Sequence, residues 1–206
     1  MADLVDDLDT TVSAATSALL EIVDHDWDIP VSGLTWTCRG TIEHVADDLF
    51  AYAGQIAPSK PEVTTYVAFD FYADREGEPT CAVHAEPDRG NAGLVQILDA
   101  CGGMLSALAR TRPPEVRGWH PYGVSDPGGF AAMGTVETML HVYDVADPLG
   151  IAWHPHADVV RRVLDRLFPD APTDGNPWQT LLHATGRDPE RPNESWQWDA
   201  TVREPA

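Results

Sequence analysis

Side chains that can bind a metal ion occur one helical turn apart in the segment GTVETMLHVYDVADPLG, residues 134–150. Glu137 and His141 are separated by four positions, so in a helix they lie on the same face. Apolar residues on either side of them predict that this face turns toward the protein interior. His44 lies at the edge of the apolar stripe of another segment with helical periodicity. An antiparallel pair of helices would bring the three side chains together.

Two imidazoles and one carboxylate form a ligand set for a divalent metal ion. Helical bundles build such sites from side chains that project inward from facing helices. Three protein ligands leave coordination positions open for water or substrate, whereas structural zinc sites are normally closed by four. The spacing alone also fits two simpler interpretations: a solvated Glu–His pair, and a core histidine that only satisfies a hydrogen bond. All three interpretations stay open at this point.

Four further residues near this pattern are candidates for a supporting or substrate-binding role. Asp144 lies one turn beyond the second histidine and could accept a hydrogen bond from it, or lie on the helix surface. Arg117 and His120 precede the helix and could line the mouth of a pocket. The guanidinium of Arg117 could bind a carboxylate through two hydrogen bonds, or pair with a surface acid. Tyr143 is expected in the core or in the pocket wall.

The apolar periodicity predicts four long helices followed by two shorter ones. Their expected ranges are 4–25, 39–57, 91–111, 127–147, 156–169 and 176–186. Thr41 is the expected N-cap of the second helix, and Gly102 and Gly103 in the third are expected to allow close packing against a neighbour. Arg187, after the last helix, is expected to bind backbone carbonyls.

The segment between the second and third helices has a different pattern. Residues 64–73 and 80–86 are rich in β-branched and aromatic residues and flank a cluster of turn-forming residues. This pattern predicts a small β-hairpin or two short strands. The predicted fold is therefore mainly α: a four-helix bundle over residues 1–150 with a β-hairpin insertion, and a short helical extension over residues 151–206 that packs on the bundle.

The composition narrows the possible partners. The 33 acidic residues outnumber 13 Lys and Arg, and the net charge of −20 disfavours nucleic acid. No apolar run approaches the ~20 residues of a membrane span, and the N-terminal segment is acidic where a signal peptide would be basic. We therefore expect a cytoplasmic protein without membrane contact. The sequence is also compatible with a homodimer formed through an outer helix face. Cys38, Cys81 and Cys101 show no paired spacing and are expected to be free thiols.

Three strings, in this order, resemble a known family. They are WTCRGTIEHVADDLFAYA at 36–53, GFAAMGTVETMLHVYDVADPLG at 129–150 and PWQTLLHATGR at 177–187. Together with the order of helices they resemble the DinB-like superfamily, and within it the mycothiol-dependent maleylpyruvate isomerase type. The resemblance implies a divalent metal ion held by His44, Glu137 and His141. Zinc is the first expectation, and the ligand types also suit nickel, iron or manganese.

The resemblance also implies a chemistry. Mycothiol, or another low-molecular-weight thiol, would bind the metal as a thiolate and attack a small electrophile, which makes the expected protein an S-transferase or isomerase. Two alternatives remain: a hydrolase that uses metal-bound hydroxide, and a metal-binding bundle without catalytic activity. The full isomerase type carries a separate C-terminal domain that contributes to its active site, whereas this chain has only a short extension after the bundle.

Overall fold

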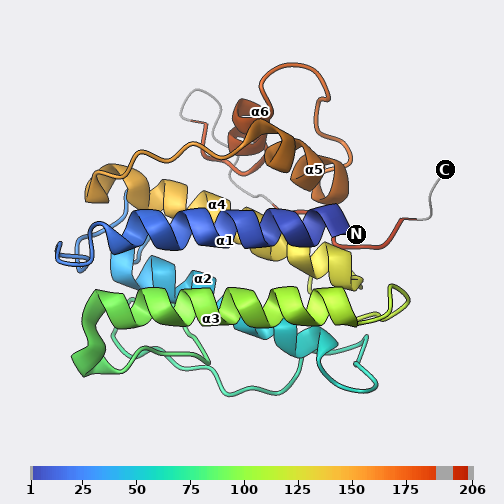
Figure 1. Cartoon of the computed structure of the whole chain (residues 1–206), viewed down its shortest axis with the longest axis horizontal. Helices are drawn as coiled ribbons and strands as arrows, with labels where there is room; N and C mark the ends of the chain where they lie inside the picture. Colours follow the sequence, from blue (N-terminus) through green and yellow to red (C-terminus); the bar gives the residue numbers. More distant parts are fainter. Residues whose placement is uncertain (1, 189–196, 204–206) are drawn as a thin grey trace.

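A computed structural model, which describes residues 2–188 and 197–203, consists of a four-helix bundle with two further helices packed on it (Figure 1). The bundle helices are α1 (Ala2–Leu20), α2 (Cys38–Ile56), α3 (Gly90–Thr111) and α4 (Pro127–Leu149), and the 3₁₀ helix η1 (Pro87–Arg89) precedes α3. Figure 1 shows that α2 and α3 run in one direction, while α1 and α4 run in the other. The connection of residues 57–86 makes this possible by returning along the bundle.

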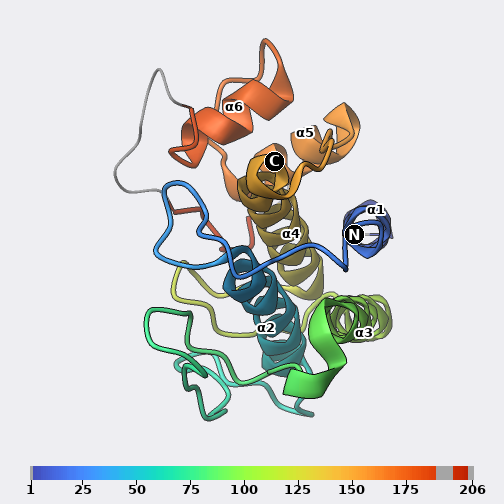
Figure 2. The ribbon, with the colours of Figure 1, turned by 90° about the vertical axis from the view of Figure 1, so that its left-hand side faces the viewer.

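Helix α4 is the central element of the fold. It packs against α1, α2, α3 and α5, and most of its residues are buried. Gly134 marks a close approach to two other helices, because a Cβ atom there would lie 2.8 Å from methyl groups of Leu49 and Leu105. Figure 2, close to an end-on view of the bundle, shows α4 between α2 on one side and α5 and α6 on the other. Polar side chains on α4 are therefore held in the protein interior.

The helices that carry the candidate ligands begin at capping side chains. Thr37 caps α2, and its hydroxyl accepts a hydrogen bond from the Gly40 N–H at 3.0 Å. The prediction of Thr41 as N-cap was wrong: this residue lies inside the first turn, and its hydroxyl donates to the Thr37 carbonyl. Thr37 has the extended backbone that an N-cap requires. Asp126 caps α4 in the same way, with its carboxylate 2.7 Å from the Gly129 nitrogen.

The predicted β-hairpin was also wrong. In the described residues between α2 and η1, pairing is limited to an isolated bridge between Tyr72 and Cys81. The amides that a second strand would use donate instead to carboxylates of α2. Ala82 and Val83 donate to Asp47 at 2.7 and 3.0 Å. Residues 64–73 are mostly exposed, so they have no buried face on which a sheet would form.

The segment after the bundle covers α4. Helix α5 (Ala157–Leu167) packs on α4 and α1, and α6 (Pro177–Ala184) packs on α5. The predicted ranges for both helices extend further than these bounds. Residues 197–203 form a packed coil in which the backbone N–H of Asp199 donates to the Leu167 carbonyl and that of Ala200 donates to the Tyr122 carbonyl. The extension thus contacts both the bundle and the loop before α4.

One segment of the described ranges, Pro87–Thr111, is long and apolar enough to cross a membrane. The prediction that no apolar segment approaches the length of a membrane span was therefore wrong for this segment. Half of the apolar window is buried inside the protein, where α3 packs against α1, α2 and α4. A buried core helix and a membrane span share this composition, so the segment is weak evidence for a membrane.

Candidate metal centre

The antiparallel pairing of α2 and α4 brings His44, Glu137 and His141 together. Each offers a ligand atom, and these atoms all lie within 4.8 Å of one another. His141 Nε2 is 3.1 Å from Glu137 Oε2, and the two imidazole rings have centroids 5.1 Å apart. The four-residue spacing on α4 sets the first distance, and the packing of α2 on α4 sets the second.

The cluster faces a cavity of about 340 Å³. Glu137 and His141 are buried, while the His44 side chain is 24% exposed, so solvent approaches from the α2 side. Aromatic side chains from four separate segments form most of the wall. They are Trp36, Tyr52, His120, Tyr122 and Trp198. The cavity therefore offers an apolar enclosure around a polar floor, as in many small-molecule sites.

The two histidines have opposite charge preferences. Burial lowers the pKa of His141, but the hydrogen bond to Asp144 and the negative charge of Glu137 outweigh burial and raise the pKa to about 9. Burial and the neighbouring charge of His141 lower the pKa of His44 to about 4. Burial disfavours the charge on Glu137, yet its contacts with both histidines hold its pKa below the ordinary value. In the metal-free protein at neutral pH, His141 is therefore the charged imidazole and His44 the neutral one.

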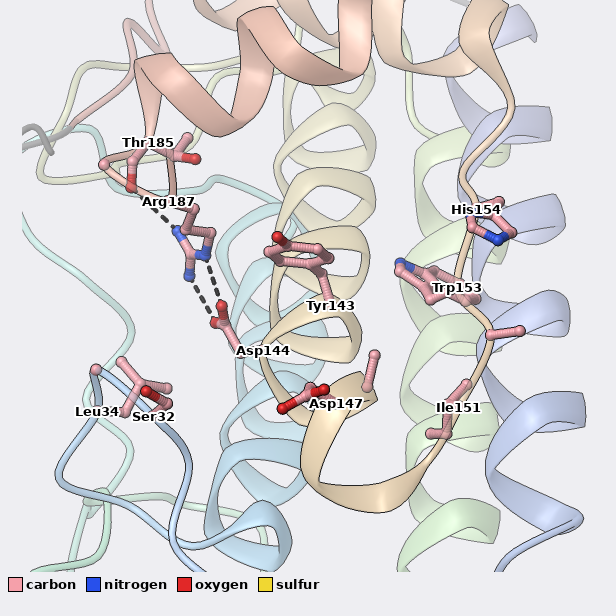
Figure 3. Close-up of a pocket in the computed structure, with 14 residues that line it drawn as sticks. Ser32, Leu34, Tyr143, Asp144, Asp147, Ile151, Trp153, His154, Thr185 and Arg187 are labelled. Carbon is pink, nitrogen blue, oxygen red and sulfur yellow. Dashed lines mark hydrogen bonds and ion pairs between the residues drawn. The ribbon is translucent and has the colours of Figure 1, made fainter. Parts of the chain in front are cut away.

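A chain of hydrogen bonds holds His141 in place. Its Nδ1 lies 2.9 Å from Asp144 Oδ2. Arg187 in turn donates to both oxygens of Asp144, from Nε at 2.8 Å and from Nη2 at 2.7 Å (Figure 3). We expected Arg187 to bind backbone carbonyls; it donates to the Thr185 carbonyl at 3.3 Å, but its main partner is this carboxylate. The chain Arg187–Asp144–His141 fixes the orientation of the imidazole.

The three residues fit a divalent metal ion. Glu137 Oε2 is buried and faces His141 Nε2, but it has no hydrogen-bond partner among the described residues. In the metal-free protein the charged imidazole of His141, 3.1 Å away, compensates the burial of this oxygen, and a bound cation would take over that role. His141 holds Nδ1 against a carboxylate, as metal-binding histidines usually do, and so presents Nε2 to the cluster. The neutral imidazole of His44 supplies a third donor of the type that zinc and its neighbours accept.

The structure distributes the other predicted residues over three places. His120 lines the cavity, where it stacks on Trp198 and where burial lowers its pKa to about 4. Tyr143 lies outside the cavity and packs against Trp178. Arg117 does not line the cavity either, and its guanidinium donates to the carbonyls of Pro114 and Val116.

Several residues of the site were not predicted. Asp48 follows His44 by four positions on α2 and lines the cavity, so the same spacing rule could have found it. Tyr52, four positions further on, was expected in the core or the pocket wall and lines the cavity. Asp48 Oδ2 lies 3.3 Å from His44 Nε2. The ring of Trp36 lies 4.8 Å from the His44 ring, and no local pattern indicates this contact. The three cysteines are free thiols, as predicted; they are buried and do not line the cavity.

A larger groove lies beside the Asp144–Arg187 pair. Its volume is about 840 Å³, and Figure 3 shows Tyr143, Asp147 and Trp153 arranged around it. Leu34 and Arg187 line both the groove and the smaller cavity. The two hollows are therefore neighbours with a shared wall.

Comparison with known proteins places the chain in a family. The sequence model of the mycothiol maleylpyruvate isomerase N-terminal domain matches residues 5–146, which include all of α2 and most of α1 and α4. The matched range contains His44, Glu137 and His141. No curated protein and no solved structure gave a significant match.

Proposed function

Because the chain belongs to the family of the mycothiol maleylpyruvate isomerase N-terminal domain, we propose that it is a metal-dependent enzyme that transfers or transiently adds a small thiol to an electrophile. The observation that carries this proposal is the cluster of two imidazoles and a buried carboxylate at the floor of an aromatic cavity. His44, Glu137 and His141 would hold the metal ion. We propose zinc as the metal, because it commonly binds two imidazoles and a carboxylate.

When bound, a divalent metal ion supplies Lewis-acid stabilisation that favours the deprotonated form of a thiol. The protein contributes the surroundings. His141 is held by Asp144, so its Nε2 points into the cluster without reorganisation. The aromatic walls limit the water that reaches the reacting groups, which strengthens electrostatic interactions there.

We propose that the polar body of the thiol lies in the larger groove. This groove shares Leu34 and Arg187 with the cavity, so a ligand that crosses the shared wall would occupy both. Asp147 offers hydrogen-bond acceptors, and the rings of Tyr143 and Trp153 offer flat surfaces for a sugar-like body (Figure 3). The electrophile would then lie on the aromatic side, near Trp36 and Trp198.

The first test is the metal content of the purified protein beside His44→Ala and His141→Ala. At the proposed centre both variants should lose one metal ion per chain while they remain folded by circular dichroism. His154→Ala is the matched control, because His154 is exposed and lies outside the cluster. If the two variants bind as much metal as the parent protein after incubation with zinc or nickel, the proposal loses its basis.

The second test is turnover with a thiol and an electrophile, supplied together and separately. A transferase or isomerase needs the thiol. Turnover of an ester or amide without any thiol would assign a hydrolase instead, and a loaded protein without activity would assign a binding role. Tyr143→Ala should raise the KM for the thiol more than it lowers kcat if the groove holds the thiol body.

A further inference from the structure

A second cluster of metal-ligand type lies on the other side of α2. It consists of Glu43 on α2 and of Asp74 and His84 in the connection of residues 57–86. Their ligand atoms also lie within 4.8 Å of one another. Figures 1 and 2 show that this connection follows α2 on the side away from α4. The cluster is thus separate from the centre formed by α2 with α4.

The hydrogen bonding of His84 fixes which ring nitrogen faces the cluster. His84 Nε2 lies 2.9 Å from the Cys81 carbonyl, which can only accept, so Nε2 carries the hydrogen. Nδ1 then points toward the two carboxylates. It is buried and has no hydrogen-bond partner among the described residues, in a side chain that is 9% exposed. The Tyr72 ring, with its centroid 4.3 Å away, packs against the imidazole.

The distances around Nδ1 suit a shared cation. Nδ1 is 3.3 Å from Asp74 Oδ2 and 3.7 Å from Glu43 Oε2. Both distances exceed the usual N–H···O range of about 2.7–3.2 Å. Two ligand atoms that each lie ~2.0–2.1 Å from one tetrahedral zinc ion are separated by roughly 3.3–3.4 Å. Two anionic oxygens at these distances from Nδ1 call for a positive charge between them, which either a proton on Nδ1 or a metal ion supplies.

We propose that Glu43, Asp74 and His84 bind a second divalent metal ion, of the zinc type. The Asp74 side chain is 43% exposed, and a hollow of about 620 Å³ borders both carboxylates, so water reaches the remaining coordination position. The ion joins α2 to a connection that has no helix or strand in its described residues. By bridging these two segments, the ion fixes the 57–86 connection against α2.

The test counts zinc in the full-length chain. Metal-free protein is loaded with Zn²⁺, desalted and analysed as parent, His44→Ala, His84→Gln and the double variant. We expect about two equivalents in the parent, about one in each single variant and none in the double variant. Asp74→Asn, at a half-exposed position that tolerates the change, should match His84→Gln. His154→Gln and Asp70→Asn are matched controls at exposed positions.

A second measurement uses the His44→Ala protein, in which the first centre is disrupted. Zn²⁺ should slow proteolysis within residues 57–86 in this background, and His84→Gln should abolish the protection. The proposal is overturned if His44→Ala retains no zinc, or if its zinc content is the same with and without His84→Gln. It is equally overturned if nuclear magnetic resonance shows that His84 Nδ1 carries a proton that Zn²⁺ does not displace. Each of these results concerns the second cluster alone and leaves the function proposed for the first centre unaffected.

Discussion

Arg187 donates hydrogen bonds to both oxygens of Asp144, from Nε at 2.8 Å and from Nη2 at 2.7 Å. Asp144 is also hydrogen-bonded to the ring of His141. The arginine follows α6, and the family match ends at residue 146. A side chain from the C-terminal extension therefore orients a proposed metal ligand in the bundle. The relationship predicts that the extension affects metal affinity without touching the metal.

Arg187→Lys should weaken metal binding. An ammonium group cannot make the paired hydrogen bonds of a guanidinium, so Asp144 loses one of the two hydrogen bonds that it accepts from residue 187. Asp144 then holds the His141 ring less firmly. Changes in such supporting contacts lower metal affinity by about 10–100-fold. Competition with a chromophoric chelator measures the affinity, and Arg161→Lys on α5 is the control. Equal affinities for Arg187→Lys and the parent would show that the ion pair does not support the centre.

Metal binding at the first centre should release a proton at neutral pH. Burial lowers the pKa of His141, but the neighbouring carboxylates of Asp144 and Glu137 raise it to about 9, so at pH 7 a metal ion must displace the proton from this imidazole. His44, with a pKa of about 4, has none to release. Apparent affinity should therefore increase with pH, about tenfold per unit, until it levels off above pH 9.

Isothermal titration calorimetry in two buffers of different ionisation enthalpy measures this release. We expect about one proton per metal ion at pH 7 in the His84→Gln background, where the first centre is studied alone. Heats that do not depend on the buffer would mean that His141 is not the group displaced.

The adjacent glycines of α3 should respond oppositely to alanine. A Cβ at Gly102 would lie 2.8 and 3.0 Å from the methyl groups of Val12, a stiff β-branched side chain in the core, whereas a Cβ at Gly103 meets nothing within 4 Å. Gly102→Ala should cost about 1–3 kcal/mol of unfolding free energy through overpacking. Gly103→Ala should gain about 0.5–1 kcal/mol through helix propensity. Urea denaturation compares the two, and destabilisation of similar size would contradict the assigned packing.

Asp47→Ala should release the connection between α2 and α3. Asp47 is buried and accepts the amide hydrogens of Ala82 and Val83, which would lose their partner. Leaving buried donors unpaired costs about 1–3 kcal/mol. Proteolysis of residues 57–86 should accelerate along with this loss of stability. Asp70→Ala, an exposed carboxylate in the same connection, should behave like the parent.

Local patterns were sufficient to predict the helices and the first cluster. Glu137 and His141 are paired by helix geometry alone, and the apolar stripe of α2 identifies the face that carries His44. The N-cap of α2 was misplaced because Thr37 and Thr41 have the same capping chemistry. They differ in backbone conformation, which depends on the chain before the helix.

Contacts between distant segments explain what the sequence did not reveal. Residues 64–86 have strand-like composition, but Asp47 and Glu43 on α2 take the amide hydrogens that a hairpin would pair. Arg187 reaches Asp144 only because α5 and α6 fold back over α4. Neither contact follows from a local pattern, since each depends on how separate elements pack.

Arg187 follows all four bundle helices in the chain, and this order also sets the order of events during synthesis. A chain leaves the ribosome N-terminus first, so α1 to α4 and all three proposed ligands emerge before the arginine that steadies His141. Until then Asp144 faces water without its guanidinium partner. A nascent chain can thus gather the ligands of the centre, but it acquires their final rigidity only when translation passes the end of α6.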